Sequence, residues 1–258
     1  MNVRQKLTDQ LYHTLEVAVV KGTGVVPFVR PDVDDIVARV NALSGRTLDL
    51  RRPIDFFDER LSVDVLERVA KDYTRKAQVL AATAGAGAGS IGIPGIALDV
   101  PMLVTATVGL VRRHALTYGF TEIEDSHGDA VPLLLALGAS IGAEITIDQI
   151  APRLAQKVGV EVGGKLVERY LLKRISEQLA AKIVTSWLPR AVPVIGAATS
   201  AALDYAFLRV IGWRSSRHYR AQHLFVRGQM ARQRLNESMD QRLSELANSE
   251  SLDAAQNV

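Results

Sequence analysis

A short run in the middle of the chain has the residue types of a serine nucleophile. Gly138-Ala-Ser140-Ile-Gly142 matches the string GxSxG, in which α/β-hydrolases hold a reactive serine on a tight turn between a strand and a helix. Residues 131–137 could be read as that strand. The acids and histidines in the right order for a triad are Asp148, Asp204, His218 and His223. Because the flanks are Ala-rich and long helical patterns surround them, a Ser140 hydrolase is the alternative interpretation, and our main interpretation assigns no catalytic residue.

The other motifs predict neither a cofactor nor a metal. Gly87-x-Gly89-x-x-Gly92 matches the dinucleotide fingerprint as a string, but a helical segment precedes it, Pro94 follows it, and no βαβ alternation is visible. No glycine run ends in the GK[ST] that places a lysine on phosphate. The five histidines show neither HExxH nor i, i+4 spacing, and cysteine is absent. We expect no cofactor and no metal.

Two isolated carboxylates are the ionisable residues that stand out. Asp99 and Asp204 each end an Ala-Leu-Asp tripeptide after a Pro/Gly loop, in a locally uncharged helical stretch. A buried ionised carboxylate is costly unless it is partnered. Each aspartate could cap a helix or pair with an arginine such as Arg112, or it could supply a polar contact in a hydrophobic groove.

Arginines late in the chain indicate an anionic partner. The formal net charge of +3 is too small to argue for nucleic acid, but residues 209–234 contain seven arginines and no acid. Basic residues beside apolar helices attract anionic lipid headgroups at roughly 1 kcal/mol per charge. A solvated helix face is the competing interpretation. The residues that we expect to meet headgroups are Arg209, Arg214, Arg217 and Arg220.

The composition favours an all-α protein. Apolar residues make up 48% of the 258 residues and aromatic residues only 5%, so Ala, Val, Leu and Ile carry the apolar share. That mixture suits helix–helix packing better than a β-sandwich. The absence of cysteine fits a reducing compartment, and the first 20 residues lack the features of a secretion signal. We expect a cytoplasmic protein with a capacity for membrane association.

Hydrophobic periodicity predicts where the helices lie. The first half should contain an amphipathic helix over 3–20, a short helix over 32–43, and a connector over 46–60 whose Phe56 and Phe57 dock on the body. A helix from about 61 should fray near Gly85–Gly89. Its expected inner face is Val65, Leu66, Val69, Tyr73 and Val79.

The remaining segments predict helical hairpins tipped by Gly/Pro loops. The loop Ser90–Gly95 should turn the chain into a helix over 96–118, with Pro101 near its start, where a missing N–H costs little. A charged helix is expected over about 165–187. Residues 188–219 then repeat the order of Pro-containing loop, Gly/Ala run, Ala-Leu-Asp, apolar helix and arginines, which predicts two similar hairpins that face each other. Chance similarity of two Ala-rich helices is the alternative.

None of the uncharged stretches predicts a membrane-spanning helix. The longest, 80–98, has 19 residues but contains a Gly-Ile-Pro-Gly turn, and the stretches 131–143 and 191–203 have 13 each. A spanning helix needs about 20 apolar residues. Partial insertion of the hairpin tips stays open.

Two of these segments resemble the bacterial EcsC family. The likeness lies in AGAGAGSIGIPGIALDVPMLVTATVGLVRRHALTYGF and WLPRAVPVIGAATSAALDYAFL, and it covers roughly residues 61–225. One departure is Thr121-Glu122 after Tyr-Gly-Phe, where the family usually has an aromatic or acidic residue. The resemblance implies a helical bacterial protein that is cytoplasmic or membrane-associated. The family takes its name from a gene beside an ABC transporter, and it supplies no catalytic mechanism to carry over.

The resemblance marks a set of positions as candidates for ligand or lipid binding. They are Gly85, Gly87, Gly89, Pro94, Gly95, Asp99, Pro101, Tyr118, Gly119, Pro193, Gly196 and Asp204. The domain organisation that we predict is N-terminal helices with the connector over 1–60, an EcsC-like helical core over 61–226, and a polar tail over 227–258 that frays or is disordered after Gly228.

The sequence therefore predicts an all-α helical bundle without enzymatic activity. Its expected partner is a membrane surface or a lipid-like ligand held between the hairpins, and not nucleic acid. The alternatives are the Ser140 hydrolase and a helical protein that binds a protein partner with no lipid role. The oligomeric state is left open.

Overall fold

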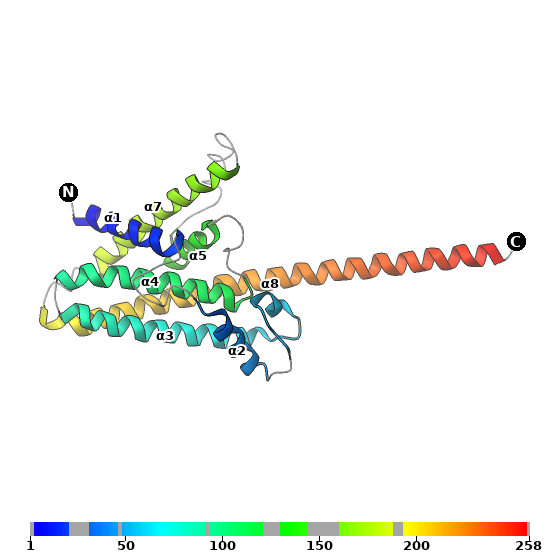
Figure 1. Ribbon diagram of the computed structural model, residues 1–258, viewed down its shortest axis with the longest axis horizontal. Coiled ribbons are helices and arrows are strands. Elements are labelled where there is room, and N and C mark those ends of the chain that lie inside the picture. The colour runs from blue at the N-terminus through cyan, green and yellow to red at the C-terminus, as the bar shows by residue number, and fades with distance from the viewer. Residues whose placement is uncertain are drawn as a thin grey trace. The chain divides into compact units, whose positions relative to one another are not determined.

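The computed structural model confirms an all-α fold (Figure 1). It describes residues 3–20, 31–45, 48–90, 93–120, 130–143, 160–187 and 193–256, and no strand occurs within these ranges. Side chains are described in the central parts of these segments. The predicted breaks at 22–27, 120–128 and 188–192 lie largely or wholly outside the described residues.

The N-terminal elements are two helices that pack against later parts of the chain. Helix α1 (Val3–Leu15) continues into a π-helical turn (Glu16–Val20). Helix α2 (Val33–Leu43) begins where the carboxylate of Asp32 accepts hydrogen bonds from the backbone N–H groups of residues 34 and 35, at 3.0 and 3.2 Å. This N-cap satisfies donors that have no partner within the helix. The predicted helix over 32–43 is thus confirmed.

The connector after α2 docks as the sequence predicts. Its short 3-10 helix (Pro53–Phe57) places Phe56 and Phe57 in the core, where they are 0% and 5% exposed. The hydroxyl of Tyr73 donates to Asp35 Oδ2 at 2.7 Å, which ties α2 to the next helix.

Helices α3 (Val63–Ser90) and α4 (Ile93–Thr117) lie side by side as an antiparallel pair (Figure 1). Three predictions about them are wrong. Helix α3 does not fray at Gly85–Gly89 but continues to its end at Ser90. Because α4 starts at Ile93, the loop is shorter than Ser90–Gly95, and Pro101 lies in the helix interior. Val79 is 58% exposed, whereas the rest of the predicted inner face is buried.

Three further helices follow in the described part of the chain. Helix α5 (Val131–Ile141) ends at Gly142, whose φ of 68° is left-handed, and α7 (Val160–Trp187) packs against α1 and α5. Helix α8 (Pro193–Gln256) does not end at Gly228, so the expectation that the tail frays there is wrong. The pairing of α7 with α8 as a second hairpin stays a prediction.

The chain forms two compact units, Met1–Arg220 and Ala221–Val258. Residues 193–220 of α8 belong to the first unit and residues 221–256 to the second. The predicted domain limits at 60 and 226 stay a prediction.

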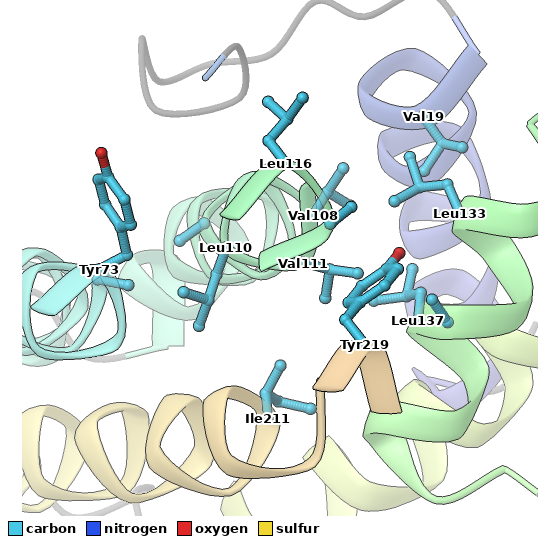
Figure 2. Close-up of a cluster of buried hydrophobic side chains, with 14 of the residues drawn as sticks. Val19, Tyr73, Val108, Leu110, Val111, Leu116, Leu133, Leu137, Ile211 and Tyr219 are labelled. Atoms are coloured by element: carbon cyan, nitrogen blue, oxygen red, sulfur yellow. The ribbon is translucent and has the colours of Figure 1, made fainter. Parts of the chain in front are cut away.

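The core of the first unit lies where α3, α4, α5 and α8 meet (Figure 2). Side chains from these helices and from the π-helical turn converge there, and most are less than 5% exposed. Those labelled are Val19, Tyr73, Val108, Leu110, Val111, Leu116, Leu133, Leu137, Ile211 and Tyr219. Within the described residues, no helix combines the length and hydropathy that a membrane crossing requires.

Candidate functional site

Helix α8 packs along α3 in the antiparallel sense at two close approaches. A Cβ atom at Gly85 would lie 2.2 Å from Asp204 Oδ2, and a Cβ at Gly212 would lie 2.4 Å from Thr74 Cγ2. The ion pair between Glu67 and Arg220 lies farther along the same two helices, in the same antiparallel order. A side chain at position 212 would therefore overlap Thr74, and one at position 85 would displace the Asp204 carboxylate.

A buried histidine joins α4 to both of these helices. His114 is 0% exposed, and its Nε2 lies 3.1 Å from the carbonyl oxygen of Ala70. Because a carbonyl only accepts, Nε2 carries the proton, and Nδ1 accepts from the hydroxyl of Ser215 at 2.6 Å. Burial lowers the pKa of His114 to about 4. The imidazole is therefore neutral near pH 7 and serves as a structural link between three helices.

The Tyr-Gly-Phe motif ends α4 and anchors it. The Gly119 N–H donates to Leu116 O and the Phe120 N–H to Ala115 O, each at 3.0 Å, which is the Schellman arrangement with a left-handed glycine at φ 91°. Tyr118 is buried, and its hydroxyl lies 2.8 Å from Ser216 Oγ.

The ring of Phe120 packs edge-on against Phe57 and at a tilt against Tyr219, with centroid distances of 5.6 and 5.7 Å. The residues of the motif therefore hold helices together, and the structure assigns them a packing role.

Asp204 lies beside a small cavity. It is 1% exposed and lines this cavity together with side chains of α3 and α4, which are Leu80, Ala81, Ala84, Met102, Leu103 and Ala106. The volume is about 10 Å³, close to the minimum of about 10–15 Å³ that one water molecule needs. A lipid chain does not fit there without movement of the helices.

One side of α8 in the first unit faces solvent and mixes aromatic and cationic side chains. Tyr205, Val210 and Trp213 are 42%, 47% and 58% exposed. Arg209 and Arg217 are exposed on the same side, and the Arg217 guanidinium lies over the Trp213 ring at 4.7 Å. We call these five residues the outward face of α8. Their spacing of three or four residues places them together on a helix.

Of the four predicted headgroup arginines, two face solvent and two contact other helices. Arg209 and Arg217 belong to the outward face of α8. Arg220 pairs with Glu67, and the guanidinium of Arg214 lies where a side chain at Gly142 would be. The ammonium of Lys182 donates to the carbonyl of Ile141 beside it, so that two cations lie at the negative end of the α5 dipole. Burial, together with the charge of Arg214, lowers the pKa of Lys182.

Ser140 does not have the geometry of a reactive serine. It is fully buried in the last turn of α5, and its hydroxyl donates to the carbonyl of Ala136 at 2.7 Å. A nucleophile elbow needs a strand before the serine and an exposed Oγ. Here a helix precedes Ser140, so the GxSxG string has a packing role. Within the described residues, no three His, Asp or Glu side chains gather as a potential metal site.

For two of the remaining motif positions the structure describes the surroundings, and for the others it describes only the helical backbone. Gly87 is exposed and a Cβ there would meet nothing within 4 Å, and Pro101 is half-buried in α4. Gly89, Pro94, Gly95, Asp99, Pro193 and Gly196 lie in helical backbone, but their burial and contacts fall outside what is described. Among the motif positions whose surroundings are described, the structure brings together Gly85 and Asp204.

Sequence reasoning missed the apolar half of the outward face. Tyr205, Val210 and Trp213 were part of an apolar helix in the sequence pattern, and nothing in their types indicates exposure. The available signal was spacing, because Leu208, Ile211, Ser215 and Tyr219 form the opposite, buried side of the same helix.

Comparison with known proteins identifies a family. The model of the EcsC protein family matches residues 3–224. No curated protein and no solved structure matches significantly. The matched range includes the core of the first unit and the outward face of α8.

Proposed function

The chain belongs to the EcsC protein family, and from this premise we propose that it binds the surface of anionic membranes through the outward face of α8. The observation that carries the proposal is the exposed Trp213, with Arg217 over its ring at 4.7 Å. Tryptophan beside arginine is typical of helices that lie in a membrane interface, where the ring enters the headgroup region and the cation meets phosphate.

The charge around this face supports an anionic partner. Between Asp204, which is buried, and Glu237, α8 contains no acid. Each exposed arginine contributes roughly 1 kcal/mol of attraction to an anionic surface. Two arginines together with a partly inserted tryptophan support reversible, salt-sensitive association.

Within the described residues, the alternative of a lipid-like ligand held inside the bundle has less support. The cavity beside Asp204 holds about 10 Å³, far below the roughly 300 Å³ at which ligand pockets begin. A surface contact requires no such space. Binding at the outward face of α8 is therefore the form of lipid association that the geometry favours.

Trp213 supplies the test. The chain has two tryptophans, so Trp187→Phe leaves Trp213 as the single reporter of the outward face. On titration with vesicles of phosphatidylcholine and phosphatidylglycerol, we expect a blue shift of its emission that high salt reverses. Vesicles of phosphatidylcholine alone should give little shift.

Charge-reversal variants distinguish binding through the outward face of α8 from attraction by the positive charge of the whole protein. Arg209→Glu with Arg217→Glu should lower vesicle affinity about tenfold or more at low salt. The matched control is Arg169→Glu with Lys173→Glu, which changes net charge equally at exposed positions of α7. Equal losses in both pairs would show non-specific electrostatics, and no binding by the parent protein would overturn the proposal.

A further inference from the structure

The second unit is helical, and its described side chains, those of residues 221–242, are largely exposed. Among the described residues of 221–256 the large apolar side chains include Phe225, Leu235 and Met239, which are 67%, 61% and 53% exposed. Leu224 and Met230 are 43% and 37% exposed. An isolated helix gains little stability without burial of an apolar face. Such a helix indicates a partner.

Three leucines of this unit are spaced in a regular repeat. Leu224, Leu235 and Leu246 are spaced by eleven residues, and so are Gly228 and Met239. Eleven residues make three helical turns of about 3.67 residues, close to the α-helical period. These positions therefore form a continuous stripe along the helix, and we call it the leucine stripe.

The charges of the same unit are segregated along the chain. Residues 221–236 carry three arginines and no acid, which are Arg227, Arg232 and Arg234. Residues 237–256 carry one arginine and five acids, which are Glu237, Asp240, Glu245, Glu250 and Asp253. One half is basic and the other acidic, with Leu235 near the boundary.

We propose that two copies of this chain pair through residues 221–256 as an antiparallel helical dimer that crosses at Leu235. Leu224 and Leu246 are each eleven residues from Leu235, so antiparallel copies place residue 224 of one chain against residue 246 of the other. The leucine stripes then cover each other.

Charge complementarity selects the antiparallel direction. With Leu235 at the two-fold axis, Arg232 and Arg234 of one copy lie opposite positions 238 and 236 of the other, within one turn of Glu237 and Asp240. A parallel pair would instead place like charges side by side, which is unfavourable. The proposal does not depend on membrane binding, because it uses a different part of α8.

Oligomeric mass tests the pairing. We expect light scattering of the full-length protein to give twice the chain mass in a concentration-dependent manner. Leu235→Asp with Met239→Asp should return the protein to one chain mass. The matched control, Gln233→Asp with Gln241→Asp, adds the same charge at exposed positions on the opposite side of the helix and should remain dimeric. A single-chain mass for the parent at every concentration would overturn the proposal.

Cross-linking tests the direction. Since the chain has no cysteine, single substitutions give unambiguous disulfides under mild oxidation. Leu224→Cys alone and Leu246→Cys alone should give little covalent dimer, while an equal mixture of the two should give much more. Efficient cross-linking of each variant with itself would show parallel chains and overturn the antiparallel model. A parent that dimerises only on anionic vesicles would show that the membrane, and not a second copy, is the primary partner.

Discussion

The two parts of α8 follow different packing rules although they belong to one continuous helix. In residues 193–220, Leu208, Ile211 and Ser215 are less than 2% exposed, whereas Leu235 and Met239 in residues 221–256 are more than half exposed. Glycine shows the same contrast. A Cβ at Gly212 would lie 2.4 Å from a Thr74 carbon, and a Cβ at Gly228 would meet nothing within 4 Å. The comparison shows that helix formation is local, while the need for a particular residue is set by neighbours.

The largest effect that we expect comes from the buried histidine that holds the first part of α8. The pKa of His114 falls from an ordinary 6.5 to about 4 on folding. Between these values the unfolded chain binds a proton that the folded chain excludes, so stability is full above about pH 6.5 and is lost as the pH falls toward 4. A difference of this size corresponds to about 3 kcal/mol.

The measurement is urea unfolding at about pH 7 and about pH 4. His114→Gln removes the titration while it keeps an amide that can donate and accept, so the variant should lose less stability than the parent on acidification. The pKa of His218 is also lowered by burial, and comparison of parent with variant isolates the share of His114. Identical pH dependence in both proteins would show that His114 is not the group responsible.

An alanine at each glycine of α8 tests the contrast between its two parts directly. Gly212→Ala should destabilise the first unit by about 2 kcal/mol, because the new methyl group overlaps Thr74 and overpacking outweighs the gain in helix propensity. Gly228→Ala should stabilise its helix by up to about 1 kcal/mol. Thermal unfolding and the amide exchange of each segment measure the two effects. A loss of stability at Gly212 with a gain at Gly228 would support the contrast between the two parts of α8. Stability changes of the same sign at both positions would contradict it.

A smaller effect of the same kind is expected in α3. Gly85→Ala places a methyl group against the Asp204 carboxylate, whereas Gly87→Ala faces open space. Because the carboxylate lies at the end of a side chain that can shift, we expect a loss of only about 1 kcal/mol at Gly85 and a small gain at Gly87. Chemical denaturation of the two variants checks this, and a stabilised Gly85→Ala would place α3 farther from α8 than described.

Local patterns predicted most of the helices because helix formation depends on neighbouring residues. Hydrophobic periodicity was sufficient to predict a helix over 32–43 and another from about 61, which the structure has as α2 and α3. The same reasoning erred where tertiary packing overrides propensity. Gly85 and its neighbours weaken an isolated helix, but the absence of a side chain at Gly85 is what allows α3 to approach α8 there, and the helix continues to Ser90.

The sequence by itself determined the all-α class, the family, the connector with its buried phenylalanines, and the acid-free arginine segment. Only the tertiary structure decided which arginines face solvent, that Ser140 is buried, and that His114 links three helices. The physical reason is the distance along the sequence over which each kind of interaction acts. Periodicity and capping act over one or two helical turns, whereas the contacts of His114 with Ala70 and Ser215 join residues 44 and 101 positions apart. Such contacts depend on how helices pack, which no single stretch of sequence specifies.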